Sequence, residues 1–322
     1  MAIFEATPEN LSKAAAHIQN GELVSFATET VYGLGANALS AAACEKIFAA
    51  KERPHYDPLI VHIHSLDQLK KITAEIPPLA LKVAEKFWPG PLTMVLKKAS
   101  CIPDLITANL DTVATRMPAH PVAKALLKAA DRPIAAPSAN PFGYLSPTTA
   151  AHVEEQLGEK IPMILDGGDC ECGVESTIVD FSGDTPQLLR HGGIPREEIE
   201  EVCGPVLLGK AVLERPLAPG QLVSHYAPKT PLVILKNGEV PQLEEKQKIG
   251  VLIHDEKEIP FSYEMAEVIA HNDDLKEAAH NLFAGLHRLD DADLDVIYVY
   301  EFPESGLGCA IMDRLRKAAA KR

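Results

Sequence analysis

Short apolar runs alternate with helical patterns along the first part of the chain, and this alternation limits the possible folds more than any other feature. The runs "ELVSFAT", "PLIVHIH", "TMVLKK", "DTVATRMP" and "RPIAAPSAN" predict strands, and "TIVDFSG" with "PQLLRHGG" predicts a late hairpin. The stretch "TPENLSKAAAHIQNG" predicts a helix that Thr7 caps and Gly21 ends. A second helix is expected from about Ser40 to Ala50. Strands that alternate with helices over about 200 residues are typical of an α/β fold.

A proline-rich segment separates this region from a smaller one. The stretch "LERPLAPGQLVSHYAPKTPL" has no helical or strand period, and its prolines predict a semi-rigid linker. After it, "PLVILK", "KIGVLIHD" and "LDVIYVYEF" predict strands, while "NDDLKEAAHNLFAGLHRLDD" and "GLGCAIMDRLRKAAA" predict helices. We therefore predict a domain of residues 1–205, a linker of residues 206–230 and a small α/β domain of residues 231–322.

The composition argues against several classes of protein. The formal net charge of −14 argues against broad non-specific binding of nucleic acid, although residues 206–230 are net basic. No apolar run reaches the roughly 18 residues of a membrane span, and the N-terminus lacks the pattern of a secretory signal. The six cysteines match no zinc or disulfide spacing. We expect a cytoplasmic protein with reduced thiols and no membrane partner.

The stretch "TETVYGLGANALS" lies between a predicted strand and a predicted helix. Gly33, Gly35 and Ala38 satisfy the pattern G-x-G-x-x-A, and Asp57 follows about 20 residues later, which makes a dinucleotide-binding fold one alternative. Against it, four residues separate the strand from the first glycine, and "KERP" stands where an acidic ribose ligand is expected. A glycine turn that only joins two elements is the other alternative.

Basic side chains stand at the ends of several predicted elements. Lys51 and Arg53 in "KERPHYDP" follow a helix, where the dipole favours cations, so a purely structural role is one interpretation. The other interpretation is an anion site, and it is favoured because the flanking prolines limit where Arg53 can point. Arg116 in "VATRMP" and Arg190 in "QLLRHGG" end strand-like runs. Arginine is the preferred partner of carboxylates and phosphates because its guanidinium is planar and bidentate.

Hydroxyl and amide groups stand on rigid loops between these arginines. Ser138 and Asn140 in "APSANP" follow a short strand and precede a proline, and Ser176 in "ESTIVD" begins another strand. An ordinary turn is the simple alternative, but several arginines that alternate with such loops favour a polyanion pocket, such as one for a nucleoside triphosphate. The chain has no Walker A sequence and no G-x-S-x-G nucleophile elbow, so we interpret Ser138 as a binding residue.

The motifs occur in a fixed order: a "TETVYGLG" turn, K-x-R-P, the "PLIVH" strand, T-R-x-P, S-A-N, "STIVD" and L-L-R-x-G. In this order they resemble those of the YrdC-like threonylcarbamoyl-AMP synthases across about residues 8–205. The "SHYAP" linker and the small domain resemble the long, two-domain form of that family, so the resemblance covers nearly the whole chain. Two departures are visible: alanine precedes "TET" where the family often has proline, and Asp57 stands where asparagine is common.

The resemblance implies a twisted open α/β sheet with a concave basic cleft, followed by a smaller, Rossmann-like α/β domain. It also implies ATP-dependent synthesis of L-threonylcarbamoyl-AMP from L-threonine, bicarbonate and ATP, with release of pyrophosphate, for tRNA threonylcarbamoyladenosine modification. Mg²⁺ would be carried by ATP without protein ligands, and no organic cofactor is expected. The expected partner is the downstream tRNA threonylcarbamoyl-transfer machinery, and contact with tRNA itself is left open. An RNA-binding module and a carbamoyl-transfer protein that uses carbamoyl phosphate are the alternatives.

Individual roles follow from the resemblance, position by position. It implies catalytic roles for Lys51 and Arg53. The positions that it implies for ATP are Lys51, Arg53, Asp57, Thr112, Ser138, Asn140, Ser146, Arg190 and Tyr226. Those that it implies for L-threonine are Thr30, His62, Arg116, Ala136 and Ser176, with Arg116 on the carboxylate. His62 alternates with His64 along a strand, so one of them must face away. Tyr226 is expected to fold over the cleft as a lid, with a plain spacer as the alternative.

Overall fold

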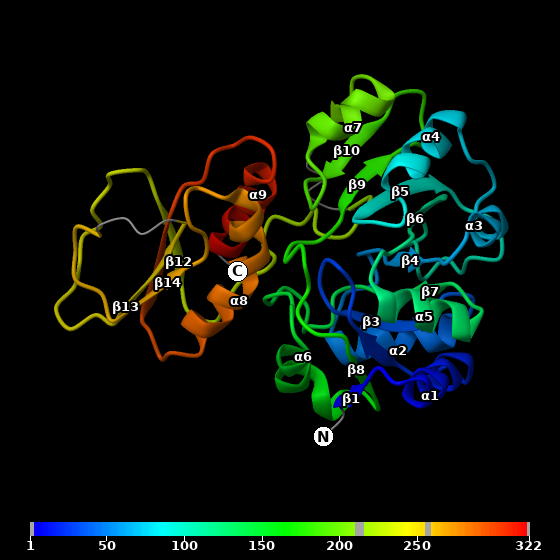
Figure 1. Cartoon of the computed structure of the whole chain (residues 1–322), viewed down its shortest axis with the longest axis horizontal. Coiled ribbons are helices and arrows are strands. Elements are labelled where there is room, and N and C mark those ends of the chain that lie inside the picture. Colours follow the sequence, from blue (N-terminus) through cyan, green and yellow to red (C-terminus); the bar gives the residue numbers. More distant parts are fainter. Residues whose placement is uncertain (1–2, 210–215, 255–258, 321–322) are drawn as a thin grey trace.

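The computed structural model describes residues 3–209, 216–254 and 259–320 and contains two α/β domains side by side (Figure 1). Residues 210–215 of the predicted linker lie outside the described residues. Within the described chain, one sheet uses strands from the first 208 residues, and the other uses strands after residue 231. No described helix is long and apolar enough to cross a membrane.

The large domain is built on a mixed sheet of eleven strands in the order β1-β8-β2-β3-β7-β4-β6-β5-β9-β10-β11. As the sequence predicts, β9 and β10 pair antiparallel. The strands are β1 (Ile3–Glu5), β2 (Val24–Phe26), β3 (Gly33–Asn37), β4 (Ile60–His62), β5 (Leu92–Lys97), β6 (Thr112–Arg116), β7 (Ile134–Ala135), β8 (Ile164–Asp166), β9 (Thr177–Asp180), β10 (Gln187–Arg190) and β11 (Leu207–Leu208).

Helices cover both faces of this sheet. On one face α1 and α5 pack against each other and against Val24 and Phe26 of β2. On the other face α2 and α4 join a cluster that contains Leu34 and Val61. Capping confirms the predicted start of α1, because the Thr7 hydroxyl accepts the N–H of Asn10 at 3.2 Å. The helices are α1 (Pro8–Gln19), α2 (Ala41–Lys51), α3 (Leu66–Ile72), α4 (Pro78–Phe87), α5 (Pro121–Ala130), α6 (Ala150–Leu157) and α7 (Arg196–Cys203).

The glycine pattern lies in a strand rather than in a loop. Gly33 and Gly35 belong to β3, which pairs antiparallel with β2 on one side and β7 on the other. A Cβ on Gly35 would stand 2.8 Å from the Phe26 ring and 2.9 Å from Ile134, so the glycine permits close packing between strands. A dinucleotide phosphate loop needs its glycines between a strand and a helix. The dinucleotide alternative and the simple turn are therefore both wrong.

The small domain has a wholly parallel sheet in the order β12-β15-β13-β14. Its helices lie on the side of this sheet that faces the large domain (Figure 1). The sequence predicts each of these elements except β14, whose residues are only half-buried. They are β12 (Leu232–Leu235), β13 (Ile249–Ile253), β14 (Met265–Val268), α8 (Leu275–Asp290), β15 (Val296–Tyr300) and α9 (Gly308–Ala319).

One apolar cluster connects the two domains. It combines Phe283 and Leu282 of α8 with Val31, Leu145 and the linker's Tyr226. Burial of such side chains stabilises the contact by the hydrophobic effect. The small domain and Tyr226 of the linker are thus packed against the loops of the large domain that carry Val31 and Leu145.

Two histidines also meet across this contact. His152 of α6 and His287 of α8 stack with their ring centroids 4.0 Å apart, and His287 Nε2 lies 3.2 Å from the Ser146 carbonyl oxygen. Burial lowers the pKa of each imidazole to about 4. Both rings are therefore neutral in the folded protein at pH 6, whereas the unfolded chain binds protons below its usual pKa of about 6.5.

We expect stability to fall as the pH drops from about 6.5 to about 4, because the unfolded state binds more protons in that window. The melting temperature of the protein should fall by about 5 °C or more over this range. A His152→Phe variant keeps an aromatic ring without the titrating group, and it should show a smaller fall. His17→Asn, at a half-exposed histidine beside Glu22, is the control and should behave as the wild type. Equal pH dependence in all three proteins would contradict this assignment.

Candidate active site

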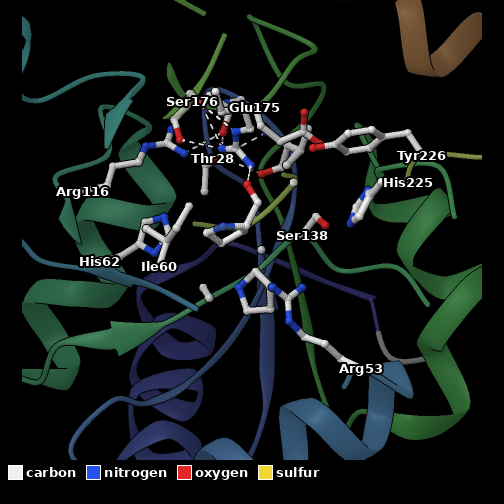
Figure 2. Close-up of a pocket in the computed structure, with 18 residues that line it drawn as sticks. Thr28, Arg53, Ile60, His62, Arg116, Ser138, Glu175, Ser176, His225 and Tyr226 are labelled. Carbon is white, nitrogen blue, oxygen red and sulfur yellow. Dashed lines mark hydrogen bonds between the residues drawn. The ribbon is translucent and has the colours of Figure 1, made fainter. Parts of the chain in front are cut away.

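Predicted site residues from distant parts of the chain line one cavity between the large sheet and the linker. Figure 2 shows Arg53, Arg116 and Ser176 around this space, with His225 and Tyr226 closing one side. Of the predicted residues, those that line it are Thr30, Arg53, His62, Arg116, Ala136, Ser138, Ser176, Arg190 and Tyr226. Lys51, Asp57, Thr112, Asn140 and Ser146 are not among the lining residues. We call this cavity the cleft.

Arg116 stands at the end of β6, beside His62 at the end of the parallel strand β4. Its guanidinium lies 2.7 Å from a Glu29 carboxylate oxygen and donates to the Thr30 hydroxyl at 2.8 Å. Burial raises the pKa of Glu29, but the charge and hydrogen bond of Arg116 outweigh burial and hold that pKa below its usual range. The part of the cleft around Arg116 thus contains a paired, buried cation and carboxylate.

His62 faces the cleft and is nearly fully buried. Burial, assisted by the positive charge of Arg116, lowers the pKa of His62 to about 3, so the imidazole is neutral. His64, two residues later, is partly exposed, and its Nε2 lies 3.9 Å from Asp131. The expectation that only one of the two histidines faces the site is confirmed.

Arg53 is held in place by the turn that follows α2. Its guanidinium lies 2.9 Å from an Asp57 carboxylate oxygen and donates to the carbonyl oxygens of Asp57 and Pro58 at 3.1 and 2.7 Å. Asp57 is fully buried, and burial raises its pKa while the charge of Arg53 opposes that shift. Asp57 therefore orients the arginine, and its predicted contact with ATP stays a prediction.

Lys51 is not among the residues that line the cleft. The residue is 1% exposed, and its ammonium donates to the Ser138 carbonyl oxygen at 2.6 Å and to the Asn140 carbonyl oxygen. Burial lowers the pKa of Lys51 well below its usual value, and the nearby charge of Arg53 adds to that shift. In this arrangement Lys51 supports the loop that presents Ser138. Its predicted role on the phosphates is not tested by this contact.

The other predicted residues away from the cleft have local partners. The Asn140 amide donates to the Pro141 and Tyr144 carbonyl oxygens at 2.9 and 3.0 Å. Ser146 donates to a Glu175 carboxylate oxygen at 2.5 Å. Thr112 begins β6, and Arg116 ends it, so roughly four residues, or about 13 Å of strand, separate Thr112 from the cleft. Their assignment to ATP stays a prediction.

Arg190 connects the sheet to the linker. It donates to the Ser176 carbonyl oxygen at 3.1 and 2.9 Å, to the Ser176 hydroxyl at 3.1 Å and to the Pro219 carbonyl oxygen at 3.1 Å. Thr93 fixes the same hydroxyl from β5 at 2.7 Å. Ser176 and Arg190 therefore form one hydrogen-bonded unit at the edge of the cleft.

The described part of the linker covers the cleft. Tyr226 is 1% exposed, has a positive φ of 61° and packs its ring on that of Phe283 at a centroid distance of 5.7 Å. His225 packs beside it at 4.1 Å, and burial raises the pKa of Tyr226 to about 12. A spacer would not need a buried tyrosine in a strained conformation, so the arrangement favours the lid.

Sequence reasoning missed several groups at this site. Thr28, Glu175 and His225 also line the cleft, and Glu29 pairs with the lining residue Arg116. Glu29 lies inside the "TET" motif, and Glu175 directly precedes Ser176, so reading whole motifs instead of single positions would have found both. Among the described residues, no group of three or more His, Cys, Asp and Glu side chains is placed to hold a metal ion.

Comparison with known proteins gives a consistent family. A family model described as "Telomere recombination" (Sua5_yciO_yrdC) matches residues 16–192, and one described as "Threonylcarbamoyl-AMP synthase, C-terminal domain" matches residues 194–320. The threonylcarbamoyl-AMP synthase of Pyrococcus abyssi is 47% identical, with 96% of this chain and 94% of that protein covered. That of Bacillus subtilis is 42% identical, with 97% and 93% covered.

Solved structures agree. A crystal structure of P. abyssi Sua5 complexed with L-threonine matches with a TM-score of 0.91 at 42% identity, and covers 99% of this chain and 96% of that one. Escherichia coli YciO, at 22% identity and a TM-score of 0.52, matches 58% of this chain and 90% of its own and shares the fold of the large domain. The predicted twisted α/β fold is thus confirmed, and the chain belongs to the two-domain threonylcarbamoyl-AMP synthase family.

Proposed function

We propose that this chain makes L-threonylcarbamoyl-AMP from L-threonine, bicarbonate and ATP in the cytoplasm, with release of pyrophosphate. The observation that carries the proposal is that Arg53, Arg116 and Arg190, from three distant turns and strand ends, meet at one cleft together with serine and threonine hydroxyls. All the substrates carry carboxylate, bicarbonate or phosphate groups, which repel one another in water. Fixed cations in a buried cleft offset that repulsion.

Threonine fits the part of the cleft around Arg116. Its carboxylate would pair with the Arg116 guanidinium, which already bonds Glu29 and Thr30. Ser176, which directly precedes β9, lines the same cleft. The neutral His62 can exchange hydrogen bonds without adding charge. The P. abyssi Sua5 structure with bound L-threonine supports this substrate.

ATP fits the part of the cleft around Arg53, Ser138 and Arg190. The two guanidiniums would hold phosphate oxygens, and Mg²⁺ would enter on the triphosphate. Threonine's amine first forms a carbamate, either with carbon dioxide and loss of a proton or with bicarbonate and loss of water. An oxygen of the carbamate then attacks the α-phosphorus, and pyrophosphate leaves. The main source of rate is positioning together with electrostatic stabilisation, since no covalent enzyme intermediate is required.

The product is an activated mixed anhydride that water destroys, so exclusion of water by Tyr226 and the linker would protect it. Transfer to tRNA then falls to downstream machinery. An RNA-binding module and a carbamoyl-phosphate enzyme were the other interpretations of the sequence. The full-length relatives are threonylcarbamoyl-AMP synthases, which supports the synthase and neither of these two alternatives.

Pyrophosphate release tests the proposal directly. With ATP, Mg²⁺, threonine and bicarbonate present, the purified protein should release pyrophosphate, and omission of threonine or of bicarbonate should reduce the rate to background. Carbamoyl phosphate should not replace bicarbonate and ATP. Release that is indifferent to threonine would contradict the proposal.

A further inference from the structure

Helix α9 of the small domain brings a fully buried arginine to the edge of the cleft. Arg314 has no exposed side-chain surface, and its Nε donates to a Glu175 carboxylate oxygen at 2.7 Å. Glu175 itself lines the cleft, directly before Ser176. A cation from the second domain therefore neutralises a carboxylate of the site.

The same face of α9 also contacts the linker. Lys317, one helical turn after Arg314, donates to the Gly220 carbonyl oxygen at 2.6 Å, and its own carbonyl oxygen accepts the N–H of His225 at 3.3 Å. The Arg314 guanidinium lies 5.1 Å from the centre of the Tyr226 ring, a cation–π contact. Both ends of the segment 220–226 are thus attached to α9.

Charge explains why these attachments matter to the site. Burial raises the pKa of Glu175, but the charges of Arg314 and then Arg190 outweigh burial and lower it to about 2, so the carboxylate stays ionised. A buried carboxylate needs a cationic partner. If α9 moved away, the charge of Arg190 would be left to offset that of Glu175. Arg190 would then pair with the Glu175 carboxylate instead of with an anionic ligand.

We propose that Arg314 and Lys317 form an interdomain latch that positions the linker segment 220–226 over the cleft and keeps Arg190 available for an anionic ligand. The inference rests on the proposed function, and it gives the small domain a role in that function. Arg314 and Lys317 are positioning residues, because they act through Glu175, Gly220 and Tyr226.

Kinetics and proteolysis test the latch in the full-length protein. We expect Arg314→Gln and Lys317→Ala each to raise the KM for ATP by about tenfold or more, because a loosened lid lets substrate escape. Chymotrypsin should cleave after Tyr226 at least about tenfold faster in both variants than in the wild type, since opening exposes this buried residue. Arg316→Gln is the matched control: it lies on the same helix, but its half-exposed side chain pairs with Glu304.

A purely structural role would lower kcat through a smaller folded fraction and leave the KM unchanged, and it would increase cleavage throughout the chain. Because Arg314→Gln leaves Glu175 unpaired and can fail to fold, the double variant Glu175→Gln/Arg314→Gln and the milder Lys317→Ala carry the proteolysis test as well. Wild-type KM values and wild-type protection of Tyr226 in Lys317→Ala and in the folded Arg314 variants would overturn the latch. Loss of the proposed function would appear separately, as a wild-type protein without threonine-dependent pyrophosphate release.

Discussion

Replacing Arg116 by glutamine should raise the KM for threonine by about a hundredfold or more, since loss of a buried charged pair with a ligand costs about 2–5 kcal/mol. The KM for ATP should change much less, because Arg53 and Arg190 remain. Steady-state pyrophosphate release at varied threonine and varied ATP separates the two constants. An enzyme that used carbamoyl phosphate would not depend on this arginine in that way.

The Arg116→Gln substitution also leaves the buried Glu29 carboxylate without its cationic partner. Glu29 lies 2.7 Å from Arg116, and removal of one partner of a buried ion pair destabilises a protein by about 3–5 kcal/mol. The double variant Glu29→Gln/Arg116→Gln removes both charges and should recover part of the lost stability without recovering threonine use. Threonine kinetics like those of the wild type in either folded variant would refute the role of Arg116.

Replacing Arg53 by alanine should lower the rate of pyrophosphate release by about 10²–10³-fold, the usual effect of losing one preorganised group that stabilises a transition state. Here the group that loses its cationic partner is Asp57, whose carboxylate lies 2.9 Å from the Arg53 guanidinium. Asp57→Asn therefore belongs in the same experiment, both alone and with Arg53→Ala.

The double variant Arg53→Ala/Asp57→Asn should fold more stably than Arg53→Ala and remain inactive, because it restores charge balance but not the cation. Thermal melts and pyrophosphate release measure the two properties independently. Arg132→Ala, at an exposed arginine that bonds the Asp131 carbonyl oxygen, is the surface control and should keep full activity. Recovery of activity in the double variant would show that Arg53 only neutralises Asp57.

Much of the fold could be predicted because its signals are local. Thr7 and Ser40 predict helix starts because their side chains can cap a helix. Apolar β-branched runs such as the one that ends at His62 predict strands. The glycine strand β3 was missed because two glycines in five residues lower strand propensity. Its stability comes from pairing with β2 and β7 and from close contact with Phe26, which are not adjacent in sequence.

The groups that are available for chemistry can be identified from the sequence: arginines at the ends of elements, hydroxyls on rigid loops and a tyrosine in a proline-rich linker. Their partners depend on the packing of the folded chain. Arg116 pairs with Glu29, 87 positions earlier, and Arg314 pairs with Glu175 across the domain boundary. The physical reason is that the ionisation and direction of a buried charge depend on its desolvation and on the charges within a few ångströms, and these are set by packing rather than by neighbours in the chain.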